Sequence, residues 1–295
     1  MKFLAYIRLL RPHHYIKNLF VLTPLFFSFK FDDSALLLKA LGVFGLYSLT
    51  ASAVYIFNDL MDVAEDRLHP VKKNRPLASG AVSPVTAVIL SLILGTTALI
   101  IGYMLDNTLG IILSVYAGMN VLYSVRLKHF PIIDLIIISI GFVLRVLAGA
   151  VVIAVPTTMW IVLMTFLLSL FLGLAKRRDD VLLSADGTKT RKSTDGYNLE
   201  FINGGMIMMA SVVIVVYIFY ATSPEVTQRF HSNQLIYTVI FVIIGILRYL
   251  KLTFVDNKSG NPTRLLWNDR VLQFTILIWA GSFWFIVKML EKVMP

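Results

Sequence analysis

The chain has 295 residues, of which 57% are hydrophobic and 15% are charged, and its mean hydropathy is +0.77. Soluble domains carry about 25% charged residues, so this composition excludes an ordinary soluble protein, a disordered chain and a coiled coil. The apolar runs are continuous instead of alternating, which excludes a membrane β-barrel. The absence of cysteine excludes disulfide scaffolds, thiolate metal sites and cysteine nucleophiles. The sequence therefore predicts an all-α polytopic membrane protein.

Hydropathy predicts about nine membrane-spanning helices. Several begin near Pro84, Pro131, Pro156 and Pro224, because a first-turn proline gives up no hydrogen bond within the helix. The predicted spans are residues 16–31, 36–57, 84–104, 108–124, 132–154, 157–176, 205–222, 233–250 and 270–290. No soluble domain fits between these spans, and the first residues lack the pattern of a cleaved signal peptide. We therefore expect one transmembrane domain over residues 1–295.

The net charge of +10 is distributed unevenly. In the nine-span topology, 21 of the 27 Lys and Arg residues fall on the side that holds the amino terminus. The positive-inside rule places this side in the cytoplasm. We therefore expect the basic residues to face membrane lipid and phosphate-bearing ligands, not nucleic acid, in a bacterial inner membrane.

Carboxylates gather at the end of the second predicted span. Asn58, Asp62 and Asp66 recur every four residues and Asp59 lies three before Asp62, so a continuous helix would place all four on one face. Carboxylates this close repel one another beside a membrane unless a cation lies among them. Oxygen ligands without Cys or His favour Mg²⁺, which substrate phosphates usually help to coordinate. The alternative is a solvated, charged helix end.

This segment resembles the Asn-Asp-x-x-Asp-x-x-x-Asp signature of the UbiA superfamily of intramembrane prenyltransferases, and the resemblance covers nearly the whole chain. It implies nine helices around a central cavity open to the cytoplasmic side. It also implies that Asp59, Asp62 and Asp66 hold Mg²⁺ and a diphosphate, and that Asn58 orients them. These four residues are the predicted catalytic group.

The second half departs from the common family pattern, in which a second aspartate pair follows the sixth helix. This chain has Lys176 and Arg177 there, and a basic pair binds phosphate directly. The alternative is ordinary positive-inside charge. This variant is similar to the polyprenyl-phosphate phosphoribosyltransferase branch of the family, which implies transfer of 5-phosphoribose from phosphoribosyl pyrophosphate to a polyprenyl phosphate. A prenyl transfer from prenyl diphosphate to an aromatic or haem acceptor and, more remotely, cation transport stay open as alternatives.

Other polar residues are candidate substrate-binding groups. Arg145 lies deep in the predicted span 132–154, where an ionised side chain is functional by default. It would contact a substrate phosphate or ribose, or else pair with another helix. Each remaining candidate also has a structural alternative: positive-inside charge for the cations, an interfacial anchor for the tyrosine and a favourable first-turn carboxylate for the aspartate. These candidates are Lys17, Lys72, Arg75, Tyr123, Lys128 and Asp134. The sequence leaves the oligomeric state and the lipid's length open.

Overall fold

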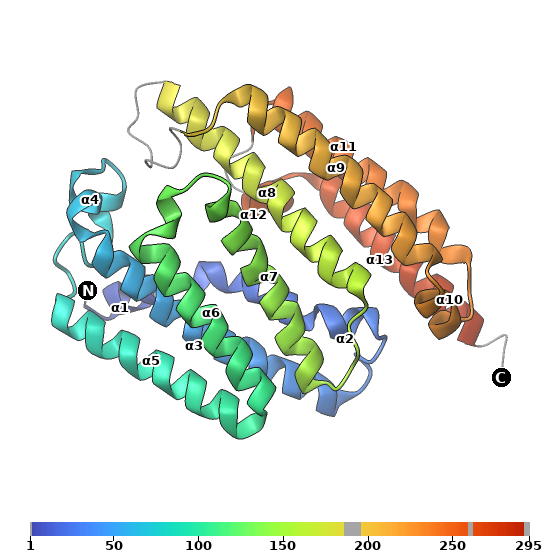
Figure 1. The fold of residues 1–295 in the computed structure, drawn as a ribbon, viewed down its shortest axis with the longest axis horizontal. Helices are drawn as coiled ribbons and strands as arrows, with labels where there is room; N and C mark the ends of the chain where they lie inside the picture. Colours follow the sequence, from blue (N-terminus) through green and yellow to red (C-terminus); the bar gives the residue numbers. More distant parts are fainter. Residues whose placement is uncertain (1, 186–195, 259–261, 292–295) are drawn as a thin grey trace. The chain divides into compact units, whose positions relative to one another are not determined.

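The structure, a computed structural model, describes residues 2–185, 196–258 and 262–291. Every regular element in these ranges is an α-helix or a 3₁₀-helix. The chain divides into two compact units, residues 1–157 and 158–295, and Figure 1 shows the helices of both. Within the described ranges, eight helices are long and apolar enough to cross a membrane. The prediction of an all-α polytopic membrane protein is confirmed, whereas the single domain over residues 1–295 stays a prediction.

The first unit is built around one long helix, α3, which packs against α5 and α6. Helix α7 closes the unit by packing against α6 and against the first 3₁₀-helix, η1. The elements of this unit are α1 (Lys2–Leu10), η1 (Pro12–Leu22), α2 (Thr23–Phe27), α3 (Ser34–Met61), α4 (Val63–Leu68), η2 (Lys72–Asn74), α5 (Pro84–Leu105), α6 (Asn107–Val125), η3 (Leu127–His129) and α7 (Ile133–Val152).

The first predicted span, residues 16–31, is not one α-helix. The chain there forms η1 and then the short α2, so the expectation of one continuous α-helix was wrong. At about 2.0 Å per residue for η1 and 1.5 Å for α2, the two elements together extend about 30 Å, which equals the hydrocarbon thickness of a bilayer. Irregular backbone at that depth must be buried in protein, and η1 packs against both α3 and α7.

A glycine permits this close packing of η1. A Cβ atom built on Gly149 of α7 would lie 1.9 Å from the carbonyl oxygen of Val21 in η1. Only a residue without a side chain fits there. The neighbouring core contains Val21, Tyr47, Leu113 and Ala148, all buried.

The described part of the second unit contains four long helices. Helix α8 packs along α9, and α11 packs against α13 and α9. Its elements are α8 (Met159–Ala185), α9 (Leu199–Thr222), α10 (Pro224–Phe230), η5 (Gln234–Thr238), α11 (Val239–Phe254), α12 (Pro262–Asn268) and α13 (Arg270–Glu291). Helix α8 continues beyond its predicted end at residue 176, so the basic pair lies within the helix and not in a connector.

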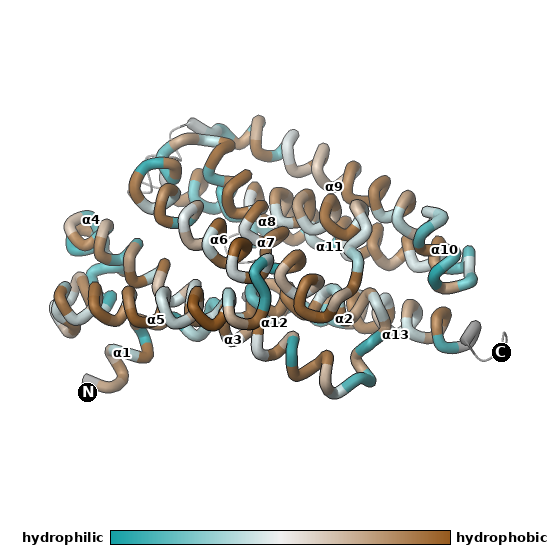
Figure 2. The backbone as a smooth tube through the Cα atoms, turned by 60° about the horizontal axis from the view of Figure 1, so that its bottom comes forward, coloured by the Kyte–Doolittle hydropathy of each residue, from teal (hydrophilic) through white to brown (hydrophobic). Residues whose placement is uncertain are grey.

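Colouring by hydropathy shows long hydrophobic stretches along the spans and hydrophilic residues at short elements such as α4 and α10 (Figure 2). Pro84 and Pro224 each lie in the first turn of a helix, as predicted. Charge therefore concentrates at helix ends, where the candidate site lies.

Candidate active site

The signature carboxylates do not share one helix: Asp59 lies on α3, Asp66 on α4 and Asp62 between the two. Helix α3 ends at Met61. Asp62 is not helical (φ −94°, ψ 1°), and α4 begins at the next residue. The expectation of one continuous helical face was therefore wrong. Asp59 and Asp66 are 1% and 3% exposed, and burial of this kind requires a positive partner for each carboxylate.

Two arginines from distant parts of the sequence supply these partners. Arg11 contacts Oδ1 of Asp59. Nη1 of Arg75 donates to the same oxygen at 3.1 Å and to Oδ2 of Asp66 at 2.6 Å. One guanidinium nitrogen thus lies between two carboxylates. Arg75 was among the predicted site residues, whereas Arg11 was not, because nothing in the sequence relates it to a residue 48 positions later.

Asp62 has a separate set of partners. Nδ2 of Asn58 donates to Oδ2 of Asp62 at 2.9 Å, and Lys128 of η3 contacts Oδ1. Lys128 is 8% exposed, so its ammonium group is held against the carboxylate. Four segments therefore meet at this end of the first unit: the turn between α1 and η1, the α3–α4 junction, the residues after α4 and the residues after α6.

The donor set fits a hard divalent cation in part. The carboxylates of Asp59 and Asp66 converge on one positive atom, as they would on a metal ion, and their oxygens are ligands that Mg²⁺ prefers. Within the part of the chain that the structure describes, however, no three His, Cys, Asp or Glu residues lie close enough to form a metal site together. A third ligand from Asp62 would require its contact with Lys128 to open.

A histidine shapes the turn that carries Arg75. Nδ1 of His69 accepts backbone N–H groups from Val71 and Lys72, at 3.2 and 3.3 Å. Partial burial, and then the positive charge of Lys72, lowers the pKa of His69. A neutral imidazole keeps the acceptor on which this turn depends.

Arg145 lies in a network of neutral partners. Its Nε, Nη1 and Nη2 donate to Oδ1 of Asn18 at 2.8 Å, the carbonyl oxygen of Gly141 at 2.6 Å and the hydroxyl of Tyr116 at 2.8 Å. The side chain is 4% exposed, and its Cζ lies 4.8 Å from the ring centre of Tyr116. These contacts are those of the structural alternative; contact with substrate stays a prediction.

The other predicted residues of the first unit lie in separate elements. Asp134, in the first turn of α7, is fully buried. Lys17 of η1, Lys72 of η2 and Tyr123 of α6 are half-buried. Each of the four interacts with other residues of the chain, and their roles toward substrate stay predictions.

In the second unit, the basic pair lies on α8 and its two members differ in exposure. Lys176 is exposed, whereas Arg177 is 2% exposed and its Nη1 donates to Oδ2 of Asp180 at 2.7 Å. The carboxylate of Asp180 thereby offsets part of the positive charge of Arg177, which was predicted to bind phosphate. Lys176 is therefore the more accessible cation of the two.

The next residue, Arg178, was not predicted. Its Nε and Nη2 donate to amide oxygens of Asn203 and Asn257, both at 3.1 Å, and its Nη1 is buried without a hydrogen-bond partner. These contacts link α8 to α9 and to the residues that follow α11. The place of Arg178 next to the predicted basic pair does not distinguish a residue that holds helices together from one that binds phosphate, because the partners Asn203 and Asn257 are 25 and 79 positions away.

An ion pair joins α11 to the start of α13. Nε and Nη2 of Arg248 donate to Oδ1 and Oδ2 of Asp269 at 3.2 and 2.6 Å, and the backbone N–H of Leu272 donates to Oδ1 at 2.9 Å. The hydrogen bond from Arg248 is the main reason that the pKa of Asp269 lies below its ordinary value. This carboxylate also caps α13.

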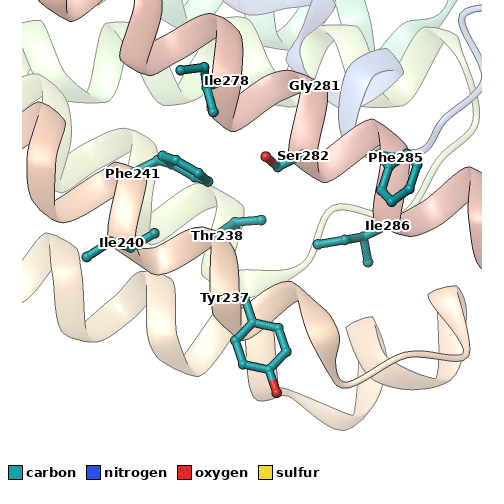
Figure 3. A pocket seen from close by; sticks show the side chains of 9 residues that line it. All are labelled: Tyr237, Thr238, Ile240, Phe241, Ile278, Gly281, Ser282, Phe285 and Ile286. Atoms are coloured by element: carbon teal, nitrogen blue, oxygen red, sulfur yellow. The ribbon is translucent and has the colours of Figure 1, made fainter.

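A groove of about 580 Å³ lies in the second unit between η5–α11 and α13 (Figure 3). Its walls are mainly Ile and Phe side chains, and none of its lining residues is Asp, Glu, Lys, Arg or His: Tyr237, Thr238, Ile240, Phe241, Ile278, Gly281, Ser282, Phe285 and Ile286. The groove therefore suits hydrocarbon and is not where a phosphate reaction takes place.

Residues 20–268 match the UbiA prenyltransferase family. The chain is 32% identical to the decaprenyl-phosphate phosphoribosyltransferase of Mycolicibacterium smegmatis, over 94% of this chain and 90% of that protein. It is also 32% identical to the enzyme of the same name from Corynebacterium glutamicum, over 98% of this chain and 87% of that protein.

Solved structures show the same fold. A UbiA homologue from Archaeoglobus fulgidus bound to GPP and Mg²⁺ superposes with a TM-score of 0.69 at 18% identity, covering 97% of this chain and 99% of that one. A digeranylgeranylglyceryl phosphate synthase gives a TM-score of 0.68 at 20% identity, with 98% and 99% covered.

Proposed function

Because the chain belongs to the UbiA prenyltransferase family, we propose that it transfers the 5-phosphoribosyl group of phosphoribosyl pyrophosphate to a polyprenyl phosphate and releases diphosphate. The observation that carries this proposal is the similarity, over nearly the full length, to enzymes named decaprenyl-phosphate phosphoribosyltransferase. The basic pair Lys176 and Arg177, in place of acidic residues, supports the same substrate class. The two units, on this proposal, form one transmembrane domain.

The cluster of three signature carboxylates serves the leaving diphosphate. Asp59, Asp62 and Asp66, with Asn58 orienting Asp62, would hold Mg²⁺ when it is bound, and the ion would offset the negative charge that develops on diphosphate. Mg²⁺ would take the place of the Arg75 guanidinium, which already lies between Asp59 and Asp66. Arg75 and Lys128 are then free to turn toward the phosphates, which is the substrate-binding role proposed for them.

The acceptor needs no general base. A phosphate oxygen of the lipid is already anionic, so it attacks the anomeric carbon while the bond from that carbon to diphosphate breaks. Positioning and electrostatic stabilisation supply the rate. Lys176, Arg177 and Arg145 are proposed to hold phosphate groups, and Lys17, Lys72, Tyr123 and Asp134 complete the binding group. Direct displacement inverts the α-configured donor and gives a β product.

The test uses purified protein in nanodiscs with Mg²⁺ and radiolabelled phosphoribosyl pyrophosphate or radiolabelled prenyl diphosphate. Each donor is supplied with polyprenyl phosphate, with an aromatic acceptor or with haem. We expect a labelled phosphoribosyl lipid of β configuration, and none in EDTA. Prenylation of an aromatic or haem acceptor would replace this proposal with the alternative, and an α product would refute single displacement.

The basic half-site, which consists of Lys176 and Arg177, has its own test. Lys176→Ala should raise the KM for a phosphate substrate about tenfold, the effect of losing about 1.4 kcal/mol from a charged contact. Lys251→Ala is the matched control, because this lysine is 52% exposed on α11 of the same unit. Equal kinetics for wild type and Lys176→Ala would remove the half-site from the proposal.

We propose that the protein lies in a bacterial inner membrane with its amino terminus and site on the cytoplasmic side. The chain has no cysteine, so one introduced thiol reports one position. Lys73→Cys, after α4, should be labelled only from the cytoplasm, and Asn107→Cys, between α5 and α6, only from outside. A cysteine at Ser193 is also expected to be labelled from the cytoplasm, but this residue lies outside the described residues.

A further inference from the structure

The amino-terminal helix α1 has two different apolar faces. On one face Leu9 is fully buried, in a cluster with Ile56 of α3 and Leu77. On the other, Phe3 and Leu4 are 76% and 55% exposed and Ile7 is 38% exposed. Residues 3, 4 and 7 lie on one side of a helix. An amphipathic helix of a soluble unit would bury one face and expose polar residues on the other, which α1 does not do.

The cluster beneath α1 extends into a membrane span. Leu90 and Leu94 of α5 pack against the same group of buried residues, and Leu94 lies ten residues past the start of that span at Pro84. Figure 2 shows α1 at the edge of the first unit, with α3 and α5 on one side of it. The cluster that α1 joins therefore includes residues of a helix long and apolar enough to cross a membrane.

The segment that contains α1 is basic. Residues 1–18 include four Lys and Arg residues and no Asp or Glu; Arg11 contacts Asp59, whereas Arg8 is exposed in the last turn of α1. A short helix with aromatic and leucine residues on one side and basic residues nearby is typical of an element that lies in the plane of the membrane surface. Basic groups there are attracted by anionic headgroups.

We propose that α1 is an in-plane anchor that inserts Phe3, Leu4 and Ile7 at the level of the lipid headgroups and binds anionic lipid through Arg8. The anchor also positions Arg11. This residue follows α1 directly with left-handed backbone (φ 55°), which is uncommon for a side chain of its size. Its guanidinium contacts Asp59 and lies 5.5 Å from the ring centre of Tyr55. Lipid contact on one side of α1 and packing on the other hold this turn in place.

Spin labels measure the insertion without reference to the reaction. Single cysteines at Phe3 and Ile7 are labelled in nanodiscs of phosphatidylcholine with phosphatidylglycerol, and Lys73→Cys, exposed after α4, is the aqueous control. We expect labels at 3 and 7 to collide more with oxygen than with a water-soluble nickel complex, and the label at 73 to show the reverse. Nickel access at 3 and 7 equal to that at 73 would overturn the anchor. Exclusion of both reagents would also overturn it, because protein and not lipid would then cover this face.

The lipid charge is tested separately. The label at Ile7 should lie deeper in nanodiscs with phosphatidylglycerol than in phosphatidylcholine alone, and Arg8→Glu should abolish the difference. Equal depth in both lipids with Arg8 present would refute binding of anionic lipid. Since neither measurement uses phosphoribosyl transfer, failure of the proposed function leaves this inference intact, and its own failure leaves the function intact.

Discussion

Nε of Arg145 on α7 donates a hydrogen bond to Oδ1 of Asn18 on η1 across 2.8 Å, although the two residues are 127 positions apart. Nδ2 of the same amide donates to Oγ of Ser48 on α3 at 3.1 Å. Asn18 thus joins three elements of the first unit. The arginine contributes a buried charge whose partners are all neutral, and this makes the pair sensitive to the loss of either member.

The Arg145–Asn18 pair predicts strong coupling in a double-mutant cycle. Arg145→Met and Asn18→Leu should each lower the free energy of unfolding by about 1–3 kcal/mol, because each leaves a buried polar group unpaired. The double variant should lose less than the sum of the two. Pulse proteolysis in detergent measures all four proteins. Arg145→Met with unchanged stability and lost activity would refute the structural part and leave only the proposed phosphate contact of this arginine.

The cluster of signature carboxylates predicts that substitutions of two neighbouring acidic residues differ sharply in their effect on kcat. Asp62→Asn should lower kcat about 100-fold or more, since the metal-assisted step is worth several kcal/mol and each 1.36 kcal/mol is tenfold in rate. Glu65→Gln, in the same short segment but exposed, should retain wild-type turnover. Initial rates of product formation, with thermal melts of each variant, measure the contrast. Equal losses in both variants would show that general charge and not a specific ligand set matters.

The close approach at Gly149 predicts that one methyl group is not tolerated. Gly149→Ala should destabilise the first unit by about 1–3 kcal/mol or more, because backbone of η1 must move to relieve the overlap. Gly42→Ala on α3 is the control: nothing lies within 4 Å of its added Cβ, and alanine gains up to about 1 kcal/mol over glycine in a helix. Thermal melts in detergent should therefore shift in opposite directions. A neutral Gly149→Ala would mean that η1 does not lie against α7.

The Arg248–Asp269 pair predicts a dependence of stability on pH. The hydrogen bond from Arg248 is the main cause that lowers the pKa of Asp269 in the folded state, so the pair stabilises the protein above the unfolded value of about 3.9. This contribution is lost as the pH falls through the lowered folded value. Asp269→Asn keeps a helix-capping residue but loses the charge. Its Tm deficit relative to wild type should be constant from pH 6 to 8 and should shrink below about pH 4. A deficit independent of pH to 3 would exclude the ion pair as its cause.

The sequence by itself determined the class, eight of the nine predicted spans within the described residues and the position of the acidic motif. Each of these depends on local composition: the bilayer sets the length of an apolar run, and proline or charge marks its ends. Helices accordingly begin at Pro84 and Pro224, and the signature aspartates lie at the end of a span, where the pattern predicted them.

Only the tertiary structure decided which charges pair and where helices change form. Arg11 with Asp59 and Lys128 with Asp62 are 48 and 66 positions apart, and no periodicity relates such residues. The 3₁₀ form of η1 accompanies a close approach to Gly149, and the interruption at Asp62 lets neighbouring carboxylates reach different cations. A buried charge takes its partner from whichever element packs beside it, so partner choice is a property of the packed helices and not of any one of them.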